Sequence, residues 1–253
     1  MPTYQEELTY YQKYLKEHPE STITKEEVIK RLSNGEPIQY ILGEVNFYGY
    51  PIKVTKDVLI PRYETELLVE KTITKIKKHF SNTPISIIDL GTGTGCIPIT
   101  LKKELPNDTT ITALDISNKA LVIAKNNAKL NDAEINFILH DMTTYIEGKY
   151  DVIISNPPYI KYDEPIMDIV KNNEPHQALY ASDNGIYFYK KIIDNLPHIT
   201  KDKYLIAFEI GYEESTEIVN YIKSKLSNVT ISIEKDYQDR DRFIFITNIK
   251  LPK

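Results

Sequence analysis

The chain has 253 residues, of which 41% are hydrophobic and 26% are charged, and its formal net charge is −5. These values are typical of a globular protein and give no sign of the strongly basic surface that coats nucleic acid. The single cysteine, Cys96, excludes an internal disulfide and any CxxC metal or redox motif. The five histidines are scattered without ligand spacing, so we predict no metal site.

The amino terminus carries early acidic residues and no apolar core, and no later apolar run is long enough to span a membrane. We therefore expect a cytoplasmic protein without membrane contact. From Tyr4 to Pro19, apolar residues recur at helical spacing. Thr24 and Glu27 form a capping box for a second helix, which is predicted to stop near Gly35. Together they predict a small helical appendage.

Residues 35–43 are predicted to be a turn-rich connector, and residues 45–58 a β-hairpin around Gly49. On the residues alone, this region could equally be only a linker. After a helix with a stripe from Val69 to Phe80, strands and helices alternate, with strands predicted at 86–90, 110–115, 135–139, 150–155 and 205–210. Such alternation predicts a doubly wound parallel α/β sheet.

Two final β-rich runs, 229–234 and 243–247, are predicted to pair antiparallel at one edge of this sheet because their connection is short. Five parallel strands followed by such a hairpin indicate the seven-stranded, Rossmann-like sheet of class I methyltransferases.

A glycine-rich turn, DLGTGTGC, occupies residues 89–96 at the end of the first parallel strand. Glycines allow a tight turn and let the backbone approach a ligand closely. Three glycines at alternate positions favour a cofactor cradle over a plain strand-to-helix turn. The predicted cofactor contacts in this loop are Gly91, Thr92, Gly93, Thr94 and Gly95.

The next two strand ends carry candidate adenosine contacts. Asp115 is placed to accept hydrogen bonds from both ribose hydroxyls, and Ser117 is the better candidate to cap the following helix. Asp141 is placed to accept from the adenine amino group, and Met142 to pack on the adenine face.

The fourth strand ends in the tetrapeptide NPPY, residues 156–159. The Asn156 side-chain oxygen and the Pro157 carbonyl would accept hydrogen bonds from a planar nitrogen, and Tyr159 offers a flat face. Orientation of this kind can supply roughly 7 to 11 kcal/mol of a barrier, so no catalytic His or Cys is needed. We predict Asn156, Pro157 and Tyr159 as catalytic, with Asn156 also touching the cofactor.

NAD and S-adenosylmethionine would both place adenosine at this edge. The glycines do not follow the GxGxxG spacing, and a dehydrogenase has no particular use for NPPY. We therefore predict S-adenosylmethionine as cofactor and S-adenosylhomocysteine as product. The acceptor nitrogen could belong to a nucleic-acid base or to a side-chain amide.

Several segments carry a resemblance to a known family: GEPIQYILG at 35–43, PRYETE at 61–66, the glycine loop, NPPY, EPHQAL at 174–179, FEIG at 208–211, KD at 235–236 and DR at 241–242. From about Gly35 onward the chain resembles the protein-(glutamine-N5) methyltransferases that modify bacterial peptide-chain release factors (PrmC/HemK). The first two segments are the more specific, which disfavours the linker interpretation.

The resemblance implies methylation of the glutamine in the Gly-Gly-Gln loop of release factors. It implies substrate contacts by Asn156, Pro157, Pro158, Tyr159, Arg62 and Glu66, with Glu174 and Pro175 on the outer side. It also implies an N-terminal helical domain (1–43) that contacts the release factor, a linking hairpin (44–60) and a methyltransferase domain (61–253). Tyr63 and Met142 depart from the family, which usually has a proline and an aromatic residue there.

Two alternatives stay open. An adenine-N6 nucleic-acid methyltransferase would grip a flipped base with the same motif, although the acidic balance and short appendage disfavour it. A non-catalytic cofactor-binding module is disfavoured by the intact NPPY tetrapeptide. We expect a monomer without a direct nucleic-acid substrate.

Overall fold

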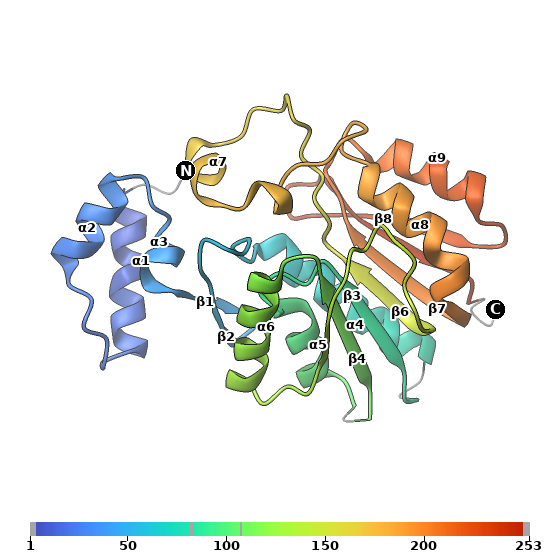
Figure 1. The fold of residues 1–253 in the computed structure, drawn as a ribbon, viewed down its shortest axis with the longest axis horizontal. Helices are drawn as coiled ribbons and strands as arrows, with labels where there is room; N and C mark the ends of the chain where they lie inside the picture. The colour runs from blue at the N-terminus through green and yellow to red at the C-terminus, as the bar shows by residue number, and fades with distance from the viewer. Residues whose placement is uncertain (1–3, 81–82, 107, 250–253) are drawn as a thin grey trace.

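The computed structural model describes residues 4–80, 83–106 and 108–249. Helices α1 (Tyr4–Glu17), α2 (Lys25–Ser33) and α3 (Ile38–Leu42) form a small unit beside the main body of the molecule, shown in blue in Figure 1. Tyr11 of α1 and Val28 of α2 pack with Ile38, Ile41 and Leu42 of α3. Thr24 caps α2 by accepting from the Glu27 backbone N–H, as the capping box predicts.

Helix α3 corrects the prediction of a connector over residues 35–43. The helix follows Pro37 and ends at Gly43, whose φ of 73° is the left-handed conformation common at helix ends. A helix of this length is unstable alone, so burial of its apolar residues against α1 and α2 holds it in place. The Tyr40 hydroxyl donates to the Val58 carbonyl at 2.6 Å and so connects α3 to the region beyond the hairpin.

The predicted β-hairpin is confirmed: β1 (Glu44–Phe47) pairs antiparallel with β2 (Tyr50–Lys53). Asn127, buried on α6 (Asn118–Leu130), fastens this hairpin to the main body. Its side chain accepts from the Lys53 N–H at 2.8 Å and donates to the carbonyls of Lys53 at 3.0 Å and Thr94 at 2.9 Å. One buried amide therefore connects the hairpin with the glycine loop.

Within the described residues, seven strands form one sheet in the order β5-β4-β3-β6-β7-β9-β8. Their bounds are β3 Ser86–Leu90, β4 Thr110–Asp115, β5 Asn136–Leu139, β6 Tyr150–Ser155, β7 Thr200–Glu209, β8 Thr230–Lys235 and β9 Asp241–Thr247. Strands β3 to β7 are parallel, and β9 pairs antiparallel with both β7 and β8. The predicted class I methyltransferase sheet with an antiparallel edge hairpin is confirmed.

Both faces of the sheet are covered by helices, because strand residues alternate between two apolar layers. Ile87 and Val152 belong to the layer with α4 (Tyr63–Phe80), α5 (Cys96–Glu104) and α6. Ile88 and Ile153 belong to the layer with α8 (Tyr187–Ile199) and α9 (Ser215–Lys225). The remaining short elements, α7 (Asp168–Asn173) and the 3₁₀ turn His176–Ala178, lie in the segment between β6 and α8 (Figure 1).

This topology positions the candidate site. Because β3 to β6 are parallel, the loops that follow their carboxyl ends meet at one edge of the sheet. The segments brought together are the glycine loop, residues 115–117, residues 140–143 and the NPPY tetrapeptide. In the part of the chain that the structure describes, no helix is long and apolar enough to cross a membrane.

Candidate active site

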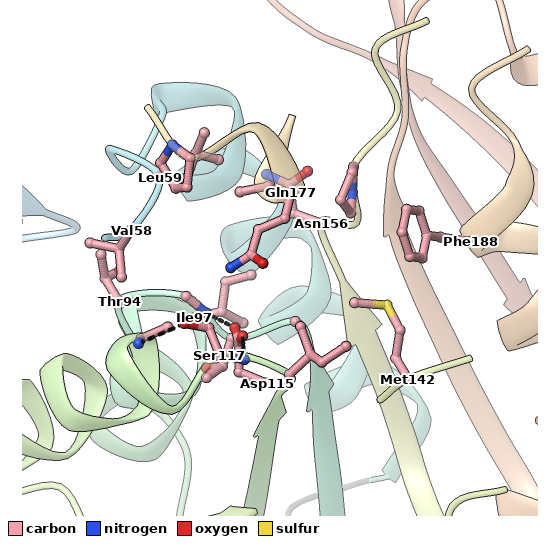
Figure 2. A pocket seen from close by; sticks show the side chains of 18 of the residues that line it. Val58, Leu59, Thr94, Ile97, Asp115, Ser117, Met142, Asn156, Gln177 and Phe188 are labelled. Atoms are coloured by element: carbon pink, nitrogen blue, oxygen red, sulfur yellow. Dashed lines mark hydrogen bonds between the residues drawn. The ribbon is translucent and has the colours of Figure 1, made fainter. Parts of the chain in front are cut away.

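A cavity of about 370 Å³ opens at the carboxyl edge of the parallel strands. Figure 2 shows Val58, Leu59 and Thr94 on one side of this cavity and Met142 and Phe188 on the other. Of the predicted cofactor contacts, the structure brings eight to its lining: Gly91, Thr92, Gly93, Thr94, Asp115, Asp141, Met142 and Asn156.

Asp115 organises the floor of this cavity. Its two carboxylate oxygens accept from the backbone N–H groups of Gly93 and Ser117, each at 2.8 Å. Ser117 caps α6 by accepting from the Ala120 N–H at 3.2 Å, as predicted, so Asp115 is not needed as the helix cap. The Ile116 backbone N–H also bonds this carboxylate, and because Asp115 lines the cavity, its remaining acceptor capacity is available to a hydroxyl donor there. Burial raises the pKa of Asp115 above its ordinary value.

The glycines of the loop have different roles. A Cβ on Gly93 would meet nothing within 4 Å, whereas a Cβ on Gly91 would lie 2.7 Å from the Met142 Cε. Gly95 is not among the residues that line the cavity, so its role as a cofactor contact stays a prediction. Its φ is 81°, and a Cβ there would lie 3.1 Å from the Ala124 Cβ. Gly95 is therefore required for close packing of α5 on α6.

The cavity fits an adenosine-containing sulfonium cofactor. Asp115 supplies acceptors for a ribose, Met142 and Ile116 supply apolar surface, and Gly93 leaves room for close approach. Asp89, near the end of β3, is fully buried, and the Thr92 hydroxyl is the polar group that interacts with its carboxylate. Burial raises the pKa of Asp89 to about 7. Asp89 does not line the cavity, so we treat it as a buried group behind the glycine loop and not as a ligand contact.

A second cavity, of about 330 Å³, adjoins the first and shares four of its lining residues: Leu59, Asn156, Pro158 and Ala178. Pro157, Tyr159 and Arg62 line only the second cavity. Three apolar residues of the segment after β6, Ile166, Met167 and Val170, form another part of its wall. The NPPY tetrapeptide therefore lies at the junction between a cofactor-sized cavity and a smaller, largely apolar one.

Asn156 is held at this junction by a buried hydrogen-bond chain. Its Nδ2 donates to the Thr65 hydroxyl at 3.0 Å, and Thr65 Oγ1 donates to Glu209 Oε2 at 2.8 Å. The Tyr159 hydroxyl lies 3.5 Å from the other Glu209 oxygen. Burial raises the pKa of Glu209 to about 7 and that of Tyr159 above its ordinary value.

Arg62 is fixed by an ion pair with Glu174, which is buried. The other Glu174 oxygen accepts from the Ile60 N–H at 3.1 Å. Glu174 thus holds the start of α4 against the segment before the 3₁₀ turn. Pro175, next to it, lines the first cavity rather than the outer side of the second.

Glu66 lines neither cavity, so the structure does not support its prediction as a substrate contact. Glu66 follows Thr65 on α4, and successive helical residues point about 100° apart. Thr65 faces the sheet, whereas Glu66 interacts with the backbone of Tyr48 in the hairpin turn.

Six of the residues that sequence reasoning missed line the cavities or support Asn156 in ways the argument uses: Leu59, Thr65, Met167, Gln177, Phe188 and Glu209. Thr65, Gln177 and Glu209 lie inside segments that carried the family resemblance, so that resemblance was the available signal. The other three lie in or beside loops without a motif. Among the described residues, no three His, Cys, Asp or Glu side chains cluster as metal ligands.

Comparison with known proteins first shows the class of protein to which this fold belongs. The family model "Methyltransferase small domain" matches residues 64–175. The human Mettl16 catalytic domain, solved in complex with an RNA hairpin, matches 81% of this chain and 79% of its own at 16% identity, with a TM-score of 0.59. The plantazolicin methyltransferase BpumL, solved in complex with SAH, matches 73% and 84% at 16% identity, with a TM-score of 0.51. The fold is that of the methyltransferases.

Curated relatives narrow this class. The release factor glutamine methyltransferase of Bacillus anthracis is 35% identical over 224 residues, which cover 87% of this chain and 79% of that protein. The enzyme of the same name from Flavobacterium psychrophilum is 41% identical over 226 residues, covering 87% and 78%. The chain belongs to the release factor glutamine methyltransferase family.

Proposed function

We propose that this protein transfers a methyl group from S-adenosylmethionine to the side-chain amide nitrogen of the glutamine in the Gly-Gly-Gln loop of a peptide-chain release factor. The single observation that carries the proposal is that Asn156 and Pro158 line two adjoining cavities at once. One cavity has the size and carboxylate of an adenosine site, and the other has the size and apolar walls for a short loop. Family membership supports the identity of the acceptor.

The residues would act by orientation. When bound, S-adenosylmethionine supplies an electrophilic methyl group on a sulfonium. Because Nδ2 of Asn156 is engaged by Thr65, its Oδ1 is left to accept one amide N–H of the glutamine. The Pro157 carbonyl would accept the other N–H. Both acceptors make the amide nitrogen more electron-rich and direct its lone pair at the methyl group.

Transfer forms a nitrogen–carbon bond, breaks the sulfur–carbon bond and releases one amide proton to water. The products are N5-methylglutamine and S-adenosylhomocysteine. Pro158 and Tyr159 would bound the glutamine side chain on its flat faces, and Arg62, fixed by Glu174, would close the mouth of the second cavity. Gly91 to Thr94, Asp115, Asp141 and Met142 would hold the cofactor.

The partner would be a release factor bound by a monomer of this protein. We assign the N-terminal helices (1–43) to partner contact, the hairpin (44–60) to linkage and residues 61–253 to methyl transfer. Hydrogen bonds between β2 and the side chains of Asn127 and Asn131 support this division, because they hold the hairpin against the methyltransferase body. A net charge of −5 argues against nucleic acid as the direct substrate. The cytoplasmic location stays a prediction.

The test uses purified protein, S-adenosylmethionine labelled in the methyl group, and four acceptors in parallel: a release factor, its Gln→Ala variant in the Gly-Gly-Gln loop, DNA and RNA. We expect label only in the unmodified release factor. Label in the Gln→Ala variant, or only in nucleic acid, would refute the glutamine assignment.

A further inference from the structure

The hydrogen-bond chain behind Asn156 joins three elements that are distant in sequence. Asn156 follows β6, Thr65 lies in the first turn of α4, and Glu209 ends β7. The Asn156 Nδ2 to Thr65 Oγ1 distance is 3.0 Å, and the Thr65 Oγ1 to Glu209 Oε2 distance is 2.8 Å. Glu209 is 1% exposed and Thr65 4% exposed, and the two side chains border the cavities, Thr65 the first and Glu209 the second. Only Asn156 of the three bears on both cavities.

The direction of this chain follows from the number of protons available. An ionised carboxylate only accepts hydrogen bonds, and a threonine hydroxyl has one proton to donate. When Glu209 is ionised, the Thr65 hydroxyl must therefore be the donor in its hydrogen bond with Glu209. The Thr65 oxygen can then only accept, so Asn156 must point its NH₂ group at Thr65. The Asn156 oxygen is thereby turned toward the junction of the cavities.

We propose that Thr65 and Glu209 are positioning residues for methyl transfer, with Glu209 fixing the Asn156 amide through Thr65 so that its oxygen faces the acceptor nitrogen. This inference rests on the proposed function. Thr65 lines the first cavity and Glu209 the second, but in this scheme both residues act on the acceptor nitrogen through Asn156.

The charge of Glu209 decides whether the orientation is unique. A protonated Glu209 can donate to Thr65, and Thr65 can then donate to Asn156. In that state an Asn156 amide rotated by 180°, with its oxygen toward Thr65, forms as many hydrogen bonds as the original orientation. A flipped amide would present an NH₂ group to the NH₂ group of the substrate, so donors would face donors. Protonation of Glu209 therefore removes the preference for the productive orientation.

The surroundings of Glu209 place this protonation near neutral pH. Burial is the main cause that raises its pKa to about 7, and Thr65 lowers it. The charged and titratable groups that face it are Arg62, Glu64, Cys96, Tyr159, Tyr189 and Arg242. Since the productive form is the ionised one, kcat falls as pH drops through the pKa of Glu209.

The first test removes the Thr65 hydroxyl and keeps the shape of the side chain. In Thr65→Val we expect kcat on the release factor to fall about 10-fold to 100-fold, with a smaller loss of S-adenosylhomocysteine affinity, because Thr65 also borders the first cavity. Thr65→Ser should restore most of the rate because it retains the hydroxyl. The matched control is Thr72→Val, which removes a fully buried hydroxyl from the same helix, where it bonds only the Leu68 carbonyl. This control should keep kcat.

The second test follows the Asn156 amide without any turnover. In protein labelled with ¹⁵N in asparagine side chains, the Asn156 NH₂ signals, assigned by their loss in Asn156→Ala, should exchange slowly with solvent. In Thr65→Val they should exchange at least about 10-fold faster, and in Thr72→Val they should not change. Unchanged exchange in Thr65→Val would overturn the inference.

The third test is the pH profile. Glu209→Gln does not titrate, so we expect a lower kcat that no longer falls on the acidic side of neutrality. A Glu209→Gln profile that keeps the acidic fall seen in the unmodified protein would overturn the role of Glu209. If the unmodified protein fails to methylate a release factor, the proposed function fails instead, and the exchange measurement still decides whether Thr65 orients Asn156.

Discussion

At the scale of single residues, the site depends on the Asn156 side-chain amide, whose nitrogen and oxygen have different partners. The Asn156 Nδ2 donates a hydrogen bond to the Thr65 hydroxyl at 3.0 Å, which leaves the Oδ1 as an acceptor at the junction of the cavities. Amide methylation needs an oriented lone pair more than a general base, and none of the histidines, all of which the structure describes, lines either cavity. The chemistry is thus concentrated in a few hydrogen-bond acceptors that are held by buried neighbours.

Replacement of Asn156 tests this arrangement. In Asn156→Ala we expect kcat to fall at least about 100-fold, because the acceptor nitrogen loses a hydrogen bond that orients it. Calorimetry should show S-adenosylhomocysteine affinity within about threefold of the unmodified protein. Asn131→Ala is the matched control, since its buried amide bonds Pro51 and Asn127 away from the cavities. Equal turnover in Asn156→Ala and in the control would remove Asn156 from the mechanism.

At this scale, local sequence patterns predicted the roles of residues that lie at the end of a strand and act within a few residues of it. Ser117 is the cap of α6, and Asp115 is free to line the cavity, because both follow directly from short-range geometry. Thr65 and Glu209 could not be predicted in this way. They are 144 residues apart, and only the sheet brings their side chains together.

At the scale of elements, two glycines of the glycine loop have different roles, one in packing and one in binding. Gly95 lies against Ala124 of α6, whereas Gly93 faces open space in the cavity. Both glycines have positive φ values, so an added Cβ costs on the order of 1 to 2 kcal/mol of backbone strain in either case. The further effects of the added methyl groups should differ.

Gly95→Ala should therefore lower the free energy of unfolding by roughly 2 to 4 kcal/mol, since the strain is joined by overpacking against α6. Gly93→Ala should lose less stability and bind S-adenosylhomocysteine about 10-fold or more weakly. Denaturant unfolding and calorimetry on both variants measure these two effects. The assignment fails if the two substitutions have the same ratio of stability loss to affinity loss.

The sequence predicted the bounds of some strands and helices better than those of others. Strands β3, β4 and β6 begin and end where apolar runs do, so their bounds agree with the prediction. Strand β7 begins at Thr200, five residues before the predicted start at 205, because its polar first half has no apolar pattern. Helix α3 was missed because it is short and depends on packing against α1 and α2 rather than on its own pattern.

At the scale of the whole molecule, two fully buried carboxylates make folding depend on pH. Burial raises the pKa values of Asp89 and Glu209 to about 7 each, well above those of an unfolded chain. The folded state therefore binds these protons more tightly than the unfolded state. Their contribution to stability is present below about pH 4 and is lost as pH rises toward 7.

Asp89→Asn should remove one half of this effect. Relative to the unmodified protein without cofactor, its free energy of unfolding should rise by roughly 2 to 3 kcal/mol between about pH 5 and pH 8. Urea unfolding of both proteins at the two pH values gives this difference directly. A difference that does not change with pH would mean that Asp89 is not protonated in the folded protein.

The central claim is that the two cavities bring a methyl donor and a glutamine side chain together at Asn156. The most direct measurement locates the product: a release factor is incubated with the protein and S-adenosylmethionine, digested, and its peptides are sequenced by mass spectrometry. We expect a single methyl group on the side chain of the glutamine in the Gly-Gly-Gln peptide, and none with Asn156→Ala. A methyl group on any other residue, or an unmodified glutamine, would contradict the account.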